Sequence, residues 1–164
     1  MLSDKNYYVM RKLHSLTGIV PLGMYLLMHL FLNSFVLLGA GSFADGVGLL
    51  HRIPYLPVLE WGMIYIPLAF HAILGILMIV EARYNTIRYG YSRNWWFWFQ
   101  RVSAVVVLLF VGWHVYATRI QLALGNVTTE GFYELLRAQF QDPLWLTVYV
   151  LGITAAALHL GNGL

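Results

Sequence analysis

The sequence predicts an all-α integral membrane protein, a single bundle of four transmembrane helices. Apolar residues make up 60% of the 164 residues and charged residues only 10%, whereas a soluble domain carries about 25% charged residues. So few charged side chains cannot cover the surface of a globule of this size, which excludes a water-soluble enzyme. Four long stretches with almost no charge account for most of the chain, and no linker separates them. We therefore treat residues 1–164 as one domain.

Each apolar stretch is long enough to cross a bilayer as a helix, which takes about 20 residues. The stretches are too long for barrel strands and do not alternate. The first begins late and carries His29 in its middle, so we expect a retained helix and not a cleaved signal peptide. The third includes Arg101, which we expect near an interface, where it snorkels or pairs. The predicted spans are 13–38, 58–82, 95–119 and 143–164.

Two connectors join these spans on the predicted outer side. The first contains His51, which we expect to be solvated. The second contains an amphipathic stretch over 131–139, with Thr129 as the expected helix N-cap. We expect this stretch to lie on the membrane surface.

The distribution of basic residues predicts the orientation. The segment before the first span and the region around the connector after the second hold seven of the ten Lys and Arg residues, against two acidic ones. The positive-inside rule therefore places the N-terminus in the cytoplasm of a multi-pass protein of the cell membrane. Trp95, Trp96 and Trp98 then form an aromatic belt at the inner interface. The basic residues are too few and scattered for a nucleic-acid-binding face.

Four of the six histidines lie deep inside the spans, one in each, whereas His14 stands at the start of the first span. At about 1.5 Å per residue, His29 and His114 lie in the outer half of the bilayer. His159 lies in the inner half and His71 near the middle, so depth pairs His29 with His114 and leaves His71 for His159. One buried histidine is explained equally well by an interhelical hydrogen bond. Four, one on each span, favour a shared function.

Facing histidines in a helix bundle are the ligand set of non-covalently bound haem. The chain has no cysteine, which excludes iron–sulfur ligation and covalent haem attachment. We therefore expect two haems at different depths, with His29 and His114 binding the outer iron and His71 and His159 the inner iron.

Small and polar residues accompany these histidines. Gly75 and Gly163 follow His71 and His159 by one turn, and Gly18 and Ser103 lie three turns before the outer histidines. These positions either make room for the inner porphyrin or let helices pack closely. The residues expected near the haem propionates are His14, Ser15, Gln100 and Arg101 at the inner end and Arg119 at the outer end, although the two arginines are also explained by snorkelling.

Four segments resemble the dihaem cytochrome b membrane-anchor subunit of succinate:quinone oxidoreductase, of the single-anchor type found in menaquinone-using bacteria. They are RKLHSLTGIVPLGMYLLMHL, PLAFHAILGI, SRNWWFWFQRVSAVVVLLFVGWHVYATRI and LHLGNGL. The resemblance implies that His29, His71, His114 and His159 are haem ligands and that His14 and Ser15 lie near the inner haem propionates. Family members continue into a fifth transmembrane helix, whereas this sequence stops at Leu164. That helix bears no haem ligand but contributes to the quinone pocket.

The resemblance also implies two partners on the cytoplasmic face, a flavoprotein subunit and an iron–sulfur subunit. Succinate would be oxidised at the flavin, and electrons would reach quinone, expected to be menaquinone, through two haems b held by this chain. The chain itself would have no dicarboxylate site. Quinone reduction needs a proton donor, and Glu60 at the outer start of the second span is the candidate, although it is also explained as a solvated carboxylate at a helix end.

Three alternatives remain open. A quinol:fumarate reductase anchor uses the same residues with electron flow reversed. A proton or metal transporter would use the same histidines, but it calls for additional buried acidic residues, and no Asp or Glu lies deep in a span. The third alternative is a structural anchor without haem.

Overall fold

The computed structural model describes residues 4–164, which are almost entirely helical and contain no strand. Some helices are interrupted by wider π turns or tighter 3₁₀ turns, here labelled η. The elements in chain order are α1 (Asp4–Thr17), η1 (Gly18–Gly23), α2 (Met24–Asn33), η2 (Ser34–Leu38), α3 (Ala40–His51), α4 (Leu56–Glu60), η3 (Trp61–Tyr65), α5 (Ile66–Glu81), α6 (Ser92–Val115), η4 (Tyr116–Ile120), α7 (Gln121–Ala123), α8 (Phe132–Gln141) and α9 (Pro143–Gly163).

Four continuous helical segments of the described chain are long and apolar enough to cross a membrane, which confirms the predicted fold class. The first and third are longer than expected, because the helices continue past the apolar stretches into polar sequence. Gly39 ends the first span with φ of 102°, a conformation that residues with a Cβ rarely adopt. The four segments are Lys5–Leu38, Leu56–Glu81, Ser92–Ala123 and Pro143–Gly163.

Three of the spans, as far as the structure describes them, contain a π turn that the sequence analysis did not predict. Pro21 lies within η1 and Pro67 lies just after η3, and a proline has no N–H to complete the regular α-helical hydrogen bond. In η4, the Thr118 hydroxyl donates to the carbonyl of His114 at 2.5 Å. That side-chain bond competes for a carbonyl that the regular helix would use. A π turn adds a residue to the turn and changes which side chains face the bundle axis.

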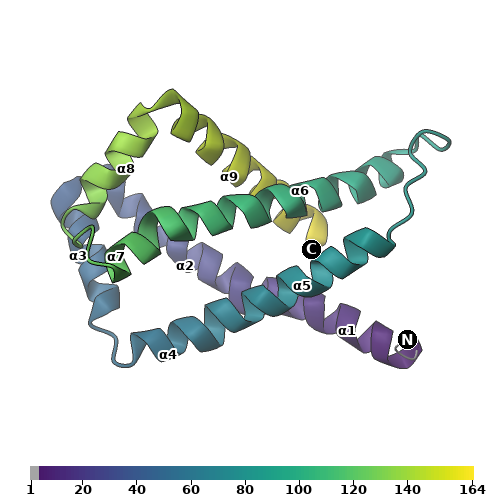
Figure 1. Ribbon diagram of the computed structural model, residues 1–164, viewed down its shortest axis with the longest axis horizontal. Helices are drawn as coiled ribbons and strands as arrows, with labels where there is room; N and C mark the ends of the chain where they lie inside the picture. The colour runs from purple at the N-terminus through teal and green to yellow at the C-terminus, as the bar shows by residue number, and fades with distance from the viewer. Residues whose placement is uncertain (1–3) are drawn as a thin grey trace.

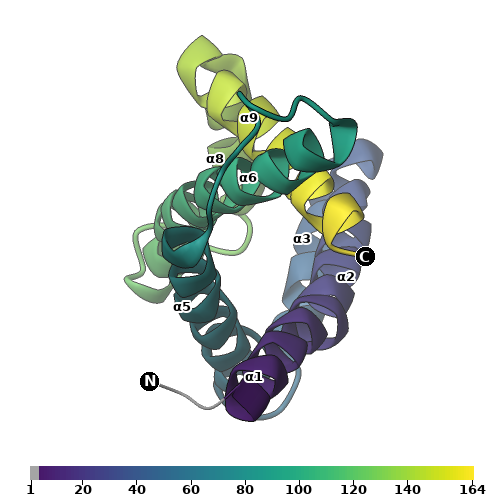
Figure 2. The same ribbon diagram turned by 90° about the vertical axis from the view of Figure 1, so that its right-hand side faces the viewer.

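The spans are arranged around a common axis, as the end-on view shows (Figure 2). α6 packs along α9, and α1 packs on α5. The segment 82–91 and the start of α1 lie at one end of the molecule, which we call the loop end (Figure 1). α3 and α8 lie at the other, the α8 end (Figure 1).

The buried hydrophobic cluster of the described residues lies at the α8 end. Phe43 of α3, Leu136 of α8 and Tyr149 of α9 are buried together, with Phe110 and Trp113 of α6 against them. Along the spans, by contrast, at most 17% of the residues in each apolar window are buried. Apolar side chains therefore cover the outside of the spans, as a lipid environment requires.

The connectors at the α8 end are more ordered than the sequence suggested. The first contains α3, a helix of three turns. The amphipathic stretch forms α8 as expected, but Thr129 as its N-cap is wrong. Gly131 occupies that position, and the hydroxyl of Thr128 accepts a hydrogen bond from the Gly131 N–H at 3.2 Å, so a turn precedes the helix. Asp142 caps α9, its carboxylate accepting from two backbone N–H groups ahead of it.

Candidate functional site

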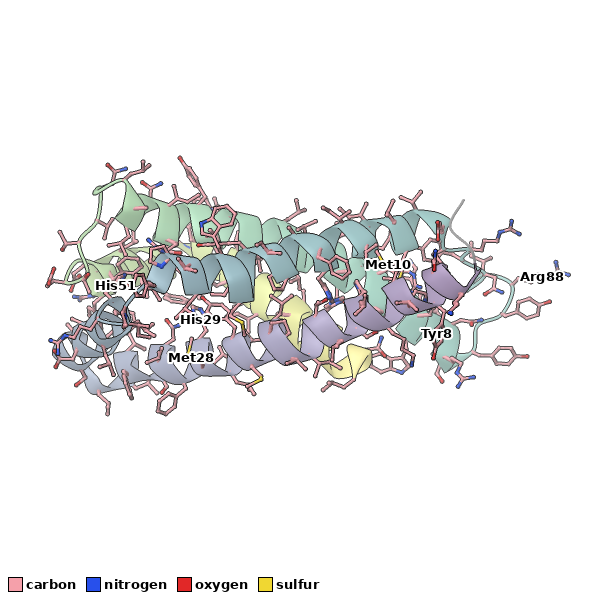
Figure 3. All side chains as sticks on the ribbon, turned by 90° about the horizontal axis from the view of Figure 1, so that it is seen from below. Tyr8, Met10, Met28, His29, His51 and Arg88 are labelled. Atoms are coloured by element: carbon pink, nitrogen blue, oxygen red, sulfur yellow. The ribbon has the colours of Figure 1, made fainter. Side chains whose placement is uncertain are left out.

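Two pairs of histidines face each other inside the bundle, at different levels along its axis. At the α8 end, His29 of α2 and His114 of α6 have ring centroids 5.8 Å apart, with ring planes at 80°. His29 lies on the bundle side of its helix in the side-chain view (Figure 3). Towards the loop end, His71 of α5 and His159 of α9 have centroids 6.1 Å apart at 90°. We call these the α8-end pair and the loop-end pair; they are the combinations that depth predicted.

Both rings of the loop-end pair are oriented by backbone carbonyls of neighbouring helices. His71 Nδ1 lies 2.9 Å from the His14 carbonyl oxygen of α1. His159 Nδ1 lies 3.2 Å from the Gln100 carbonyl oxygen of α6. A carbonyl can only accept, so each Nδ1 carries the proton and each Nε2 is left with a free lone pair. Histidines that bind metals commonly use their other nitrogen in this way.

His14 contacts the loop-end pair directly. Its ring stacks on the His71 ring with centroids 3.9 Å apart and planes at 14°. An added Cβ at Gly18 would lie 2.6 Å from Cε1 of His71, and one at Gly75 would lie 3.4 Å from Nε2 of His14. These glycines therefore bring α1 and α5 together around the two rings.

Gln100, which we expected near a haem propionate, forms two hydrogen bonds with His159 that the sequence did not predict. Its backbone carbonyl accepts from His159 Nδ1, and its side-chain Nε2 donates to the His159 carbonyl at 3.0 Å. The two bonds tie α6 to α9 at the level of the loop-end pair. An added Cβ at Gly163 would lie 3.2 Å from the same Nε2, so this glycine faces Gln100. Because Gln100 and His159 are 59 positions apart in the sequence, no local pattern could have indicated the contact between them.

The geometry of both pairs fits a shared metal ion. A metal–imidazole bond is about 2 Å long, and the ring adds about 1 Å from nitrogen to centroid, so two trans imidazoles have centroids about 6 Å apart. The observed separations are 5.8 and 6.1 Å. Within residues 4–164 no group of three or more His, Cys, Asp or Glu side chains could hold a metal ion. Haem iron needs only two axial ligands from the protein, so two-residue sites suit haem and not a bare cation.

The remaining inner candidates, Arg101 and Ser15, follow Gln100 and His14 in the sequence, and those two residues contact the loop-end pair. Arg101 has its guanidinium 3.3 Å above the Phe97 ring, and Nη1 donates to the Phe97 carbonyl at 2.8 Å. Its Nε is buried without a partner among the described residues, as is Oε1 of Gln100. An unpartnered buried cationic donor is costly, and a carboxylate would satisfy it. Ser15 is exposed on α1, next to His14.

At the α8 end, Arg119 and Glu60 form an ion pair with two hydrogen bonds. Arg119 Nε donates to Glu60 Oε1 at 2.9 Å, and Nη2 donates to Oε2 at 2.7 Å. The Glu60 side chain is 16% exposed and that of Arg119 32%. Tyr25 and Tyr65 are within electrostatic range of the pair, and the Tyr25 ring stacks on His29 at 5.6 Å. The two predicted site residues are therefore partners of each other, beside the α8-end pair.

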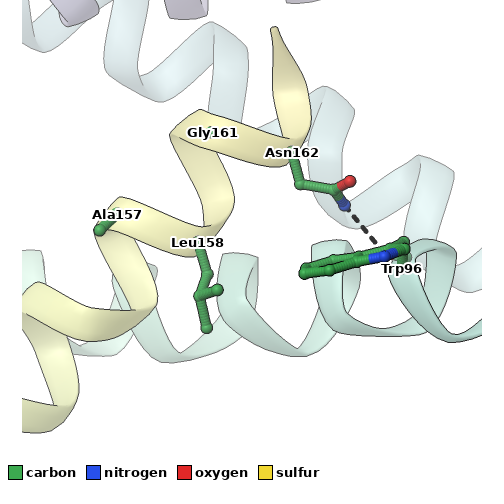
Figure 4. Close-up of a pocket in the computed structure, with 5 residues that line it drawn as sticks. All are labelled: Trp96, Ala157, Leu158, Gly161 and Asn162. Carbon is green, nitrogen blue, oxygen red and sulfur yellow. Dashed lines mark hydrogen bonds between the residues drawn. The ribbon is translucent and has the colours of Figure 1, made fainter.

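Neither His51 nor a surface groove between two of the spans involves a histidine of either pair. His51 is exposed at the end of α3, and its Nδ1 lies 2.9 Å from the Val47 carbonyl oxygen. The groove, of about 400 Å³, runs between α6 and α9, where Asn162 donates to the Trp96 carbonyl at 2.9 Å (Figure 4). It is lined by Trp96, Ala157, Leu158, Gly161 and Asn162, so none of the predicted ligands reaches it.

Comparison with known proteins shows which family the chain belongs to. The model of the succinate dehydrogenase/fumarate reductase transmembrane subunit family matches residues 82–164. The succinate dehydrogenase cytochrome b558 subunit of Bacillus subtilis (strain 168) is 34% identical over 163 residues, which cover 99% of this chain and 79% of that protein. No solved structure is a significant match. With four membrane-length helices, two facing histidine pairs and this similarity along nearly its whole length, the chain belongs to the family of succinate dehydrogenase/fumarate reductase transmembrane subunits.

Proposed function

We propose that the chain is the membrane-anchor cytochrome b of a succinate:quinone oxidoreductase and carries electrons across the membrane between an iron–sulfur partner and quinone. The observation that supports this most directly is the presence of two histidine pairs, each spaced for one iron, at two levels of the bundle. Family membership makes a haem-binding role the natural one for these pairs. One haem b held at each pair would supply a reversible one-electron carrier.

Each histidine has a defined part in this proposal. His71 and His159 would bind one iron through Nε2, because their Nδ1 atoms donate to the carbonyls of His14 and Gln100. His29 and His114 would bind the second. Held by two histidines of this chain, each haem would supply electron transfer and not oxygen binding. Arg101 would bind a propionate at the loop end, where its Nε has no other partner among the described residues.

Quinone chemistry is proposed at the α8 end. Glu60 is mostly buried, carries an ion pair with Arg119 and lies near Tyr25, which stacks on His29. A carboxylate at this position could exchange a proton with quinone beside the haem edge. Arg119 would hold Glu60 in place, so the interaction that we predicted between Arg119 and a propionate would compete with the ion pair. Menaquinone is the expected substrate.

The partners and the orientation follow from the same proposal. Flavoprotein and iron–sulfur subunits would dock at the loop end, where the basic connector and the start of α1 lie, so the loop end would face the cytoplasm. The α8 end would then face outwards, and α8 would lie along the membrane surface.

The test is a haem count and visible spectrum of the detergent-purified full chain produced with ample haem supply. We expect two haems per chain and two low-spin components. His71→Ala and His114→Ala should each remove one component and leave the other largely intact. A colourless chain would contradict the proposal and favour a haem-free anchor or a transporter. Loss of the same single component in both variants would contradict the two-level assignment.

Direction is tested separately with the assembled complex. Faster succinate oxidation with quinone than fumarate reduction with quinol would support the proposed flow. The opposite ratio would make the chain the anchor of a fumarate reductase, with the same residues and reversed electron flow.

A further inference from the structure

The α8-end pair differs from the loop-end pair in the hydrogen-bond partner of one histidine, His114. Both loop-end rings donate to backbone carbonyls. At the α8 end, by contrast, His114 Nδ1 faces a side chain, with the Tyr149 hydroxyl oxygen 3.4 Å away. A carbonyl partner is always an acceptor, whereas a hydroxyl can donate or accept. What the hydroxyl does here depends on its second contact.

That second contact makes the Tyr149 oxygen an acceptor. Its hydroxyl donates to Oε1 of Gln139 at 2.9 Å. A phenol has only one proton, so the oxygen can offer His114 only a lone pair. The His114 proton is therefore placed on Nδ1, which leaves Nε2 free to bind iron.

Tyr149 is held firmly enough to impose this arrangement. It is 5% exposed. Its ring has aromatic neighbours on several sides, with Phe140 of α8 at 4.5 Å, Trp113 at 5.3 Å and Phe110 at 5.6 Å. Because this packing already fixes the ring, the hydroxyl makes its hydrogen bonds without further loss of side-chain conformational entropy.

Gln139 brings the surface helix into this contact. It lies on α8, one turn after Leu136, which packs in the same buried cluster as Tyr149. The chain of contacts therefore runs from α8 through the Tyr149 hydroxyl to the His114 ring. No comparable side chain connects either loop-end histidine to a surface helix in the described structure.

We propose that Tyr149, held by Gln139, is a positioning residue that sets the tautomer of His114 and lowers the reduction potential of the haem at the α8 end. This rests on the proposed function, because it assumes that His114 binds haem iron. A hydrogen bond from Nδ1 makes the imidazole a stronger donor to the metal, which favours the oxidised iron. Removing the acceptor should therefore raise the potential of that haem and leave the loop-end haem unchanged.

The experiment is a redox titration of the purified haem-loaded chain, followed by visible and EPR spectra. The two components are first assigned with the His71→Ala and His114→Ala variants. Tyr149→Phe keeps the ring and removes the hydroxyl. We expect the ratio of reduced to oxidised α8-end haem at a fixed potential to rise about tenfold. This corresponds to an increase in its reduction potential of about 59 mV for one electron. Tyr133→Phe is the matched control, since Tyr133 belongs to the same apolar cluster and contacts Phe43. It should shift neither component.

Two further variants keep Tyr149 in place and test the chain of contacts. Gln139→Leu removes the acceptor that orients the hydroxyl, and we expect a smaller shift in the same direction. Gln139→Glu offers a stronger acceptor and should shift the component the opposite way. That shift should shrink when Gln139→Glu is combined with Tyr149→Phe, because the coupling passes through the hydroxyl.

The outcomes separate this inference from the proposed function. A wild-type chain without haem overturns both. Two haems in the wild type, with an unshifted α8-end component in Tyr149→Phe, overturn only the role of Tyr149. If Tyr149→Phe fails to fold, Gln139→Leu and Gln139→Glu decide the question. An unchanged reduction potential of the α8-end haem in both variants overturns the inference. Shifts of that potential in opposite directions support it. Equal shifts of both haems would indicate a general structural effect and would also overturn it.

Discussion

Gly18→Ala adds one methyl group at a position where it meets the His71 ring. The added Cβ would lie 2.6 Å from Cε1 of His71, whereas ordinary contacts begin at about 3.4 Å. The ring or the helix must therefore move by about 0.8 Å, the difference between these two distances. Gly18 is helical with negative φ, so the backbone accepts alanine and the contact with His71 is the main obstacle.

His71 has little freedom to move away. Its Nδ1 donates to the His14 carbonyl at 2.9 Å, and the His14 ring stacks on it at 3.9 Å. The side chains of a binding site must be held within about 0.5 Å of the geometry that binds the ligand. The movement that Gly18→Ala demands exceeds this, so we expect haem affinity at the loop-end pair to fall by about 10- to 100-fold, as for the loss of a hydrogen-bond partner.

The assay is the haem-to-protein ratio with limiting haem, together with the spectrum of each component. We expect the loop-end component to be lost first and the α8-end component to remain. Gly112→Ala is the matched control, because no described atom outside its own helix lies within 4 Å of an added Cβ. Full haem content in Gly18→Ala with both components unshifted would refute the steric reasoning.

Three further changes test other parts of the site. Glu60→Gln should lower quinone reduction by the complex by about 100-fold or more while haem content stays the same, because general acid–base catalysis contributes that much; unchanged turnover would remove Glu60 from the mechanism. Gln100→Leu removes the donor to the His159 carbonyl, so haem occupancy at the loop-end pair should fall while the α8-end component is retained, and equal loss of both would argue against a local effect. Asp142→Ala removes the cap of α9 and should lower the free energy of unfolding by about 1 kcal/mol in detergent, without altering either haem component.

The Glu60 test needs a control for the ion pair. Glu60→Gln leaves Arg119 without its charged partner, which could itself disturb the α8 end. Glu60→Asp keeps a carboxylate that can carry the proton. Recovery of turnover in Glu60→Asp would favour the proton role. Equal loss in both variants would indicate that the geometry of the pair with Arg119 matters more.

Local sequence was sufficient to predict the four spans of the described chain approximately and the level of each histidine along them. A membrane helix satisfies its own backbone hydrogen bonds, so its position follows from length and hydropathy along the chain. The depth of His29, His71, His114 and His159 follows from counting residues along each helix. Local patterns did less well at the connectors, where α3 was not predicted and Thr129 was taken for the N-cap of α8.

The contacts that orient the histidines were decided only by the tertiary structure. The carbonyls of His14 and Gln100, the Tyr149 hydroxyl and the pairing of Glu60 with Arg119 all join residues distant in sequence. They depend on how each helix is rotated and which helices are neighbours, and π turns such as η1 alter that rotation. Hydropathy specifies how deep a residue lies in the membrane but not which neighbour it faces, because lipid-facing and bundle-facing positions of these helices are almost equally apolar.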